Sequence, residues 1–327
     1  MKFILFIKSL ISKTMFWLRC ARLYTLPITL LSWIVIFIYS LKLGGNALFG
    51  ILALIGMSLV HMATNLVDDY FDYKVLVKNE ECQKQTKGFK CAYLKNNLAT
   101  IEDLRNAIII FLLIAAVIGA FLFFAAGKYV AILAVIGLLI AISYPKLSQN
   151  GLGEIAVISA YGPLLFEGVF YVMCGKFSID VLILSFACAL FTNTILYTHM
   201  LMDFDADKTS HKKTLCLLLK TKTNALNFLL FFYITGLLTI SYLGLRTGNY
   251  MYFLSWLVLP MIIDLYRNLR IYNTDKTHLP KLQFWHYPID NWETIKTTAD
   301  APFYFRFLYS RNISTVFMLL VCLAILF

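Results

Sequence analysis

The chain alternates between long apolar stretches and shorter polar connections. Nine stretches have about the 17–25 residues that a helix needs to cross a bilayer, and they lie at 24–41, 47–67, 107–126, 129–144, 154–174, 179–202, 225–245, 250–266 and 310–327. The pattern predicts an all-α, polytopic membrane protein with about nine transmembrane helices in one bundle around a central cavity. Because no polar segment is long enough to bury a second core, we expect residues 1–327 to form a single domain.

Two polar segments are expected outside this bundle. Near the N-terminus, Lys8 and Lys13 interrupt the apolar run and no small-residue cleavage site follows, which disfavours a signal peptide. We therefore predict an interfacial amphipathic segment over 1–23. The second segment, 267–309, is predicted to be a long cytoplasmic connection.

Composition and charge agree with a membrane location. Hydrophobic residues make up 60% of the chain and charged residues 14%, against about 25% charged in soluble domains, so most of the surface must face lipid. Of the 29 Lys and Arg residues, all but four lie before the first stretch or after an even-numbered one; the exceptions are Lys42, Lys128, Lys176 and Arg246. The positive-inside rule then places the N-terminus and these connections in the cytoplasm, with the protein in the cell inner membrane. The net charge of +11 is thus explained by topology and needs no nucleic-acid partner.

Two acidic clusters each close an apolar stretch on the predicted cytoplasmic side. In the first, Asn65, Asp69 and Asp72 fall at i, i+4 and i+7 of a helix, with Asp68 beside them. In the second, Asp203 and Asp207 fall at i and i+4, whereas Asp205 points away. Carboxylates at a membrane edge are costly and therefore candidates for function.

Both clusters offer oxygen ligands, and a lysine-rich segment follows each of them. Oxygen ligands suit a hard cation, and magnesium commonly shares itself between carboxylates and substrate phosphates. The seven cysteines show no CxxC or metal-ligand spacing, and we predict structural roles for them. The sequence therefore predicts an Mg²⁺ site that uses Asn65, Asp69, Asp72, Asp203 and Asp207.

These motifs resemble those of the UbiA superfamily of intramembrane prenyltransferases. Its first motif, an Asn followed by carboxylates four and seven positions on, matches 65–72, and its second, DxxxD, matches 203–207. Within the superfamily, four stretches resemble the MenA branch, the 1,4-dihydroxy-2-naphthoate polyprenyltransferases: R-L-Y-T-L-P at 22–27, N-L-V-D-D-Y-F-D at 65–72, G-L-G-E at 151–154 with G-P-L at 162–164, and D-F-D-A-D-K at 203–208 with K-K-T-L at 212–215. Met202 stands where that branch has an Arg.

The resemblance implies Mg²⁺-dependent transfer of a polyprenyl group from its diphosphate to an aromatic acceptor, and the likeness to the MenA branch implies that this acceptor is the naphthoate of menaquinone biosynthesis. It implies catalytic roles for Asp69, Asp72, Asp203 and Asp207. Lysine and arginine side chains near the two motifs could bind the diphosphate or an acceptor carboxylate. Tyr144 could line the pocket of the allylic cation, and His199, one helical turn before Asp203, could accept the ring proton. The predicted substrate-binding residues are Asn65, Asp68, Arg22, Lys146, Lys212, Lys213, Tyr144 and His199.

Two other functions are compatible with the same residues. One is prenyl transfer to a different acceptor, such as 4-hydroxybenzoate. The other is cation-coupled transport through the same carboxylates, although transporters usually show internal repeats and helices broken at mid-membrane depth. Acids gathered at one surface, without an evident repeat, favour the enzyme.

Overall fold

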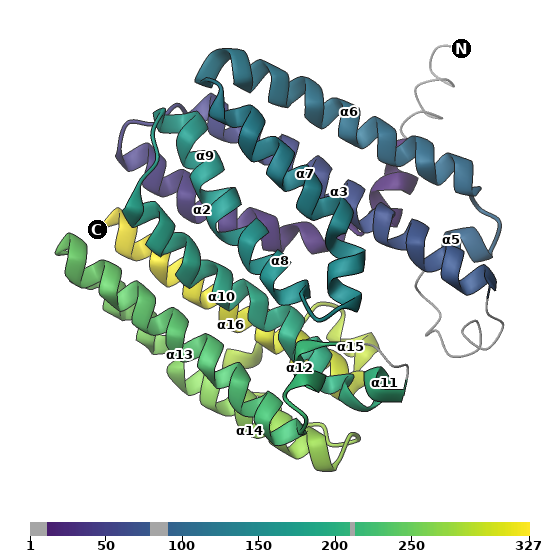
Figure 1. Cartoon of the computed structure of the whole chain (residues 1–327). Helices are drawn as coiled ribbons and strands as arrows, with labels where there is room; N and C mark the ends of the chain where they lie inside the picture. Colours follow the sequence, from purple (N-terminus) through teal and green to yellow (C-terminus); the bar gives the residue numbers. More distant parts are fainter. Residues whose placement is uncertain (1–11, 79–90, 210–212) are drawn as a thin grey trace. The chain divides into compact units, whose positions relative to one another are not determined.

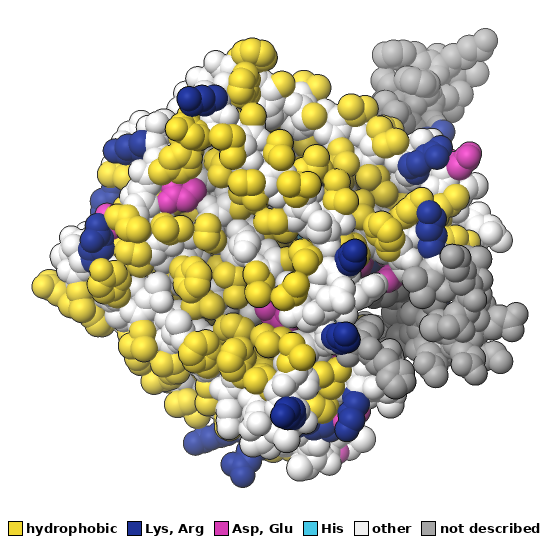
Figure 2. Space-filling view, in the orientation of Figure 1, with side chains coloured by type: hydrophobic (Ala, Val, Ile, Leu, Met, Phe, Trp, Pro, Cys, Tyr) yellow, Lys and Arg dark blue, Asp and Glu magenta, His cyan; other side chains and the backbone are white. Residues whose placement is uncertain are grey.

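The computed structural model describes residues 12–78, 91–209 and 213–327, and its regular structure there is helical apart from an isolated bridge between Asn150 and Lys213 (Figure 1). Eight of the described helices are long and apolar enough to cross a membrane. Hydrophobic side chains are spread across the face shown in Figure 2. The prediction of an all-α, multi-pass membrane protein is confirmed.

The expected count of nine spans is approximate, because the segment 250–266 is not one continuous α-helix. A 3₁₀ helix, η3 (Tyr250–Val258), runs directly into α14 (Leu259–Thr274). Pro260 lies in the first turn of α14, where its missing N–H costs no hydrogen bond and its fixed φ suits a helix start. The change of helix type therefore coincides with the position of this proline.

The chain packs as two compact units, and the first comprises Met1–Leu30 and Leu48–Pro145. It contains a helix over 12–20, the 3₁₀ turn η1 (Leu23–Thr25), the start of α2 (Leu26–Lys42), and then α3 (Ala47–Lys78), α5 (Ala92–Lys95), α6 (Ile101–Ala126) and most of α7 (Tyr129–Gln149). A core that includes Ala21, Leu66, Leu94 and Leu104 links the 12–20 helix, the start of α2, α3, α5 and α6. The N-terminus of α6 is fixed by a capping box between Thr100 and Asp103.

The second unit comprises Leu31–Ala47 and Lys146–Phe327. After the rest of α2 it contains α8 (Gly153–Ser159), η2 (Ala160–Leu164), α9 (Leu165–Cys174), α10 (Ile179–Met202), α11 (Phe204–Thr209), α12 (Leu215–Leu218), α13 (Lys222–Thr247), η3, α14, η4 (Phe284–His286), α15 (Trp292–Ile295) and α16 (Ala301–Leu326). Helix α10 packs against both α13 and α16. That residues 1–327 form a single domain stays a prediction.

The predicted span 154–174 contains a break. Pro163 lies inside η2, a π-type turn, and Gly162 before it has non-helical dihedral angles. A Cβ built on Gly162 would lie 2.7 Å from the Cβ of Ala189 on α10. Glycine at this position therefore lets the kinked segment approach α10 closely.

The connection predicted over 267–309 is shorter than expected, because α14 continues to Thr274 and α16 begins at Ala301. Its remaining residues are tied to the flanking helices. The buried guanidinium of Arg306 donates to the backbone carbonyls of Asn268, Pro302 and His278. The helices thus extend beyond the apolar stretches, because polar side chains there form hydrogen bonds with backbone groups.

Candidate active site

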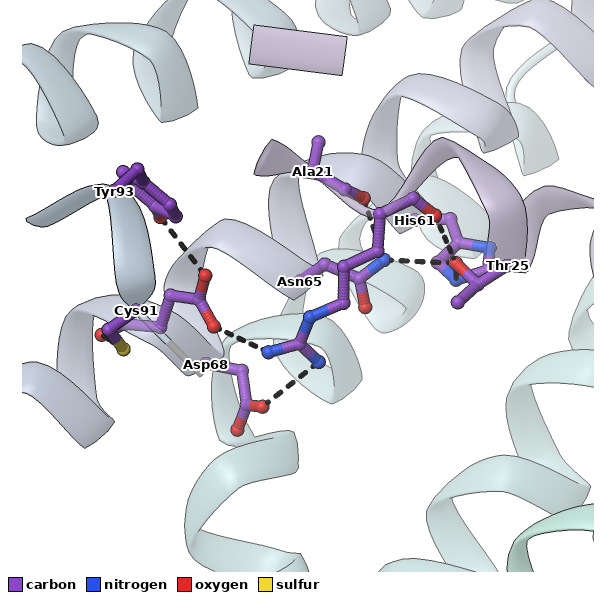
Figure 3. Close-up of polar contacts among 9 residues, drawn as sticks. Ala21, Thr25, His61, Asn65, Asp68, Cys91 and Tyr93 are labelled. Carbon is purple, nitrogen blue, oxygen red and sulfur yellow. Dashed lines mark hydrogen bonds and ion pairs between the residues drawn. The ribbon is translucent and has the colours of Figure 1, made fainter. Parts of the chain in front are cut away.

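The first acidic cluster lies on α3 and includes a cation from the residue that precedes η1. The Arg22 guanidinium contacts an oxygen of Asp69 and lies 3.5 Å from Oδ2 of Asp68 (Figure 3). The Asp69 side chain is only 4% exposed, whereas that of Asp68 is 21% exposed. An ionised carboxylate that is buried this deeply needs a partner, and Arg22 provides it.

Tyr93 and Cys91 hold Asp69 from another direction. The Tyr93 hydroxyl donates a hydrogen bond of 3.0 Å to Oδ2 of Asp69, and the Cys91 thiol lies 3.3 Å from the Asp69 backbone oxygen. Burial, and then the Asp69 carboxylate, raise the pKa of Tyr93 well above its usual range, so the phenol stays protonated and donates. Tyr93 was not predicted, because nothing in the polar connection before α6 marks this aromatic residue as a partner of an acid.

Asn65 is oriented by two acceptors. Its side-chain nitrogen donates to the Ala21 carbonyl at 2.9 Å and to Oγ1 of Thr25 at 3.2 Å. Because a carbonyl can only accept, the amide NH₂ must face Ala21, and the amide oxygen lies on the other side (Figure 3). This orientation leaves the oxygen, the atom that a metal ion would use, pointing away from these partners.

The second acidic cluster lies where α10 ends. Asp203 follows the last residue of α10, and the backbone N–H of Asp207 donates to its carbonyl at 2.8 Å, which makes one helical turn between them as predicted. Asp207 is buried and the Asp203 side chain is 33% exposed. Nδ1 of His199 lies 3.3 Å from Oδ2 of Asp203, so the predicted i, i+4 relation between these two is observed.

Asp205 takes part in a different set of contacts. Its Oδ2 accepts from Lys222 at 2.7 Å and from Lys276 at 2.9 Å. Hydrogen bonds from these two ammonium groups lower the pKa of Asp205. The structure thus separates Asp205 from the Asp203–Asp207 pair by giving it its own cationic partners.

The other predicted residues differ in their exposure. Lys146 and Lys213 are exposed, while Tyr144 and Asp72 are partly buried. Lys212 lies outside the described residues. The structure therefore brings together Arg22, Asn65, Asp68 and Asp69 in the first unit, and His199, Asp203 and Asp207 in the second.

Neither cluster is a complete protein-only metal site. In the described ranges, no group of three or more His, Cys, Asp or Glu side chains is placed to hold a metal ion. Magnesium, however, is often bound by only one or two carboxylates and takes its other ligands from water and substrate phosphates. The carboxylates and the outward-facing Asn65 oxygen fit that kind of binding.

Comparison with known proteins agrees with these motifs. A model of the UbiA prenyltransferase family matches residues 26–287. The chain is 27% identical over 216 residues to the 1,4-dihydroxy-2-naphthoate octaprenyltransferase of Escherichia coli (strain K12), covering 63% of this chain and 68% of that protein.

Solved structures share the fold. A UbiA homologue from Archaeoglobus fulgidus bound to GPP and Mg²⁺ is 14% identical, with 95% of this chain and 99% of that chain covered and a TM-score of 0.58. A UbiA homologue from Aeropyrum pernix K1 is 16% identical, with 91% of this chain and 98% of that chain covered and a TM-score of 0.60. With the family model covering most of its length, the chain belongs to the UbiA prenyltransferase family.

Proposed function

We propose that this prenyltransferase moves a polyprenyl group from its diphosphate to 1,4-dihydroxy-2-naphthoate in a reaction that requires Mg²⁺. The observation that carries the proposal is the cluster of Asn65, Asp68, Asp69 and Arg22, which collects oxygen ligands and a cation at one end of a membrane-spanning helix. The similarity to a naphthoate octaprenyltransferase supports the acceptor, and the Mg²⁺ and GPP bound to a structural neighbour support the metal and the donor.

We assign the metal to Asn65, Asp69, Asp72, Asp203 and Asp207, on the spacing of the two acidic motifs. When bound, Mg²⁺ neutralises the diphosphate oxygens and so makes diphosphate a better leaving group. The protein has already oriented two of these ligands, since Tyr93 and Arg22 fix the Asp69 carboxylate and Ala21 fixes the Asn65 amide. Ligands held in place before substrate arrives lose little conformational freedom on binding.

Cationic side chains would bind the remaining negative charge. Arg22 carries a planar guanidinium that suits a carboxylate or a phosphate, and it lies at the acidic cluster rather than in open solvent. We assign the acceptor carboxylate to Arg22, with Lys146 as a second cation, and the diphosphate to Lys212 and Lys213.

His199 would accept the proton that the acceptor ring loses. Nδ1 of His199 lies 3.3 Å from Oδ2 of Asp203, so the carboxylate would favour the ring proton on Nδ1 and leave Nε2 as the proton-accepting atom. The rings of Phe303 and Phe307 lie edge-on to the imidazole. Apolar neighbours of this kind, together with Tyr144, would keep water away from an allylic cation.

The test is a product assay. Membranes that contain the protein are incubated with Mg²⁺, prenyl diphosphates of several lengths, and dihydroxynaphthoate or 4-hydroxybenzoate, and the products are identified by mass. We expect a prenylated naphthalene product that disappears with EDTA. If only hydroxybenzoate gave a product, dihydroxynaphthoate would not be the acceptor. Full turnover in EDTA would show that the reaction does not require Mg²⁺.

A further inference from the structure

A chain of polar side chains joins the start of α2 to α3 within the first unit. His61, on α3, is one helical turn before Asn65. Its Nδ1 lies 2.7 Å from Oγ1 of Thr29 and its Nε2 lies 3.2 Å from Oγ1 of Thr25. The two threonines are themselves one turn apart near the start of α2. The imidazole therefore links a hydroxyl of η1 to one of α2; Figure 3 shows His61 beside Thr25.

The direction of each hydrogen bond follows from the partners. Oγ1 of Thr25 donates its only hydrogen to the Arg22 carbonyl at 2.8 Å, so toward His61 it must accept. The hydrogen of a neutral imidazole is then on Nε2, and Nδ1 accepts from Thr29. A single neutral tautomer of His61 satisfies both threonines.

This chain of hydrogen bonds ends at two residues of the candidate site. Arg22 adopts a left-handed backbone conformation, with φ of 59° and ψ of 51°, which residues other than glycine rarely adopt unless their surroundings hold them there. Its carbonyl accepts from both the backbone N–H and the hydroxyl of Thr25. The same hydroxyl oxygen accepts from the Asn65 amide. Thr25 is thus shared by His61, Arg22 and Asn65.

From this geometry we infer that His61 is a positioning residue. Through Thr25 it holds the turn that directs the Arg22 side chain at Asp68 and Asp69, and it keeps the Asn65 amide nitrogen engaged so that the amide oxygen remains available to a metal ion. The inference rests on the proposed function, since it assigns His61 to the binding of metal and substrate at that same site. Both ring nitrogens of His61 contact threonine hydroxyls, so we assign it a positioning role and not a role in the chemical step.

The test compares variants of this chain with a matched control on the same helix. His61→Leu removes both ring hydrogen bonds, and Thr29→Val removes one of them without changing the side-chain shape. His61→Gln retains a donor and an acceptor. As the control, Thr64→Val removes a hydroxyl that donates 2.8 Å to the Val60 carbonyl of its own helix. All variants are made in the full-length protein.

Two quantities are measured for each variant: Mn²⁺ affinity by electron paramagnetic resonance in the presence of a non-reactive prenyl thiodiphosphate, and kcat and KM for both substrates. One lost hydrogen bond corresponds to about a fivefold effect. We expect Thr29→Val to weaken Mn²⁺ binding about fivefold and His61→Leu about tenfold, with His61→Gln in between wild type and His61→Leu. The double variant with His61→Leu and Thr29→Val should bind Mn²⁺ as tightly as His61→Leu alone, because both changes break the same chain of hydrogen bonds.

The outcomes separate the two levels of the proposal. If the wild-type protein is active and both His61→Leu and Thr29→Val match Thr64→Val in Mn²⁺ affinity and kinetics, the positioning role is wrong and the proposed function stands. If the wild-type protein neither binds Mn²⁺ nor transfers a prenyl group, the proposed function fails and this role fails with it. Should His61→Leu not fold, the isosteric Thr29→Val decides the question.

Discussion

Tyr93→Phe would test whether the candidate site depends on a carboxylate held in place before substrate binds. The substitution removes one oxygen atom, the donor of the 3.0 Å hydrogen bond to Asp69. The ring remains, with its edge-on contacts to Phe16 and Trp17. The effect should therefore arise from the lost hydrogen bond and not from lost packing.

The size of the effect follows from the type of bond. A hydrogen bond to a charged group contributes about 1.5–3 kcal/mol, and both Tyr93 and Asp69 are buried, so water does not replace the lost donor readily. A loss of about 2 kcal/mol corresponds to roughly a 30-fold decrease in kcat/KM for the prenyl diphosphate. Raising the Mg²⁺ concentration should restore part of this, because a bound cation supplies positive charge to the same carboxylate.

The assay measures initial rates over a range of Mg²⁺ concentrations at saturating acceptor. Tyr73→Phe is the matched control, because Tyr73 packs against the same core from α3. Wild-type kcat/KM and unchanged Mg²⁺ dependence in Tyr93→Phe would refute the idea that this phenol prepares Asp69 for catalysis. A loss that Tyr73→Phe reproduces would point to packing instead.

Further predictions concern the second cluster and the topology. Asp203→Ala and Asp207→Ala should each reduce kcat by about 100-fold, the scale of losing one electrostatic stabiliser, whereas Asp205→Ala should reduce it by much less; equal losses in a rate assay would contradict the separation seen between them. Because its two lysine partners lower the pKa of Asp205, their pairing stabilises the folded state above the unfolded pKa of about 4 and is lost as the pH falls through the lower folded value. Thermal unfolding should thus show Asp205→Asn as less stable than wild type at neutral pH, with the difference vanishing in acid; a difference independent of pH would argue against it. Cysteine labelling should place Phe327 and the 275–300 connection on opposite sides of the membrane.

Hydropathy and charge predicted the fold class because long apolar segments have few alternatives in a bilayer, where every backbone polar group must be satisfied internally. They did not predict the break at Gly162 and Pro163, since the average hydropathy of that segment is that of an ordinary span. The ends of α14 and α16 were also missed. There, helical residues are polar, and contacts such as those of Arg306 with backbone carbonyls replace the apolar pattern as the stabilising interaction.

Spacing along a single helix was the strongest guide to the candidate site. The i, i+4 relation placed His199 beside Asp203 and Asp203 one turn from Asp207, and both relations are observed. Partners from other elements were not accessible in this way. Tyr93 reaches Asp69 across 24 positions and His61 reaches Thr25 across 36, and no local pattern encodes contacts over such separations.

Contacts at the C-terminus indicate that the chain crosses the membrane between α13 and α16, although η3 and α14 do not form one regular span. Asn249, which follows α13, donates to the carbonyl of Ala324 near the end of α16 at 2.7 Å. The end of α13 and the end of α16 therefore lie on the same side. If α16 spans the membrane, its start at Ala301 lies on the opposite side, and the chain must cross somewhere between 250 and 300.

The segment that makes this crossing must be η3 with α14. Nine residues at about 2.0 Å and sixteen at about 1.5 Å give a length of roughly 42 Å, which exceeds the roughly 30 Å of the hydrocarbon core. Lys42, which ends α2, donates to the carbonyl of Ile325 at 2.6 Å, so the end of the first span lies on that same side as well. An impermeant thiol reagent applied to intact cells should therefore label cysteines introduced at Lys42, Asn249 and Phe327 alike, and leave one at Lys296 unlabelled. Labelling at both Asn249 and Lys296 would show that η3 and α14 do not cross.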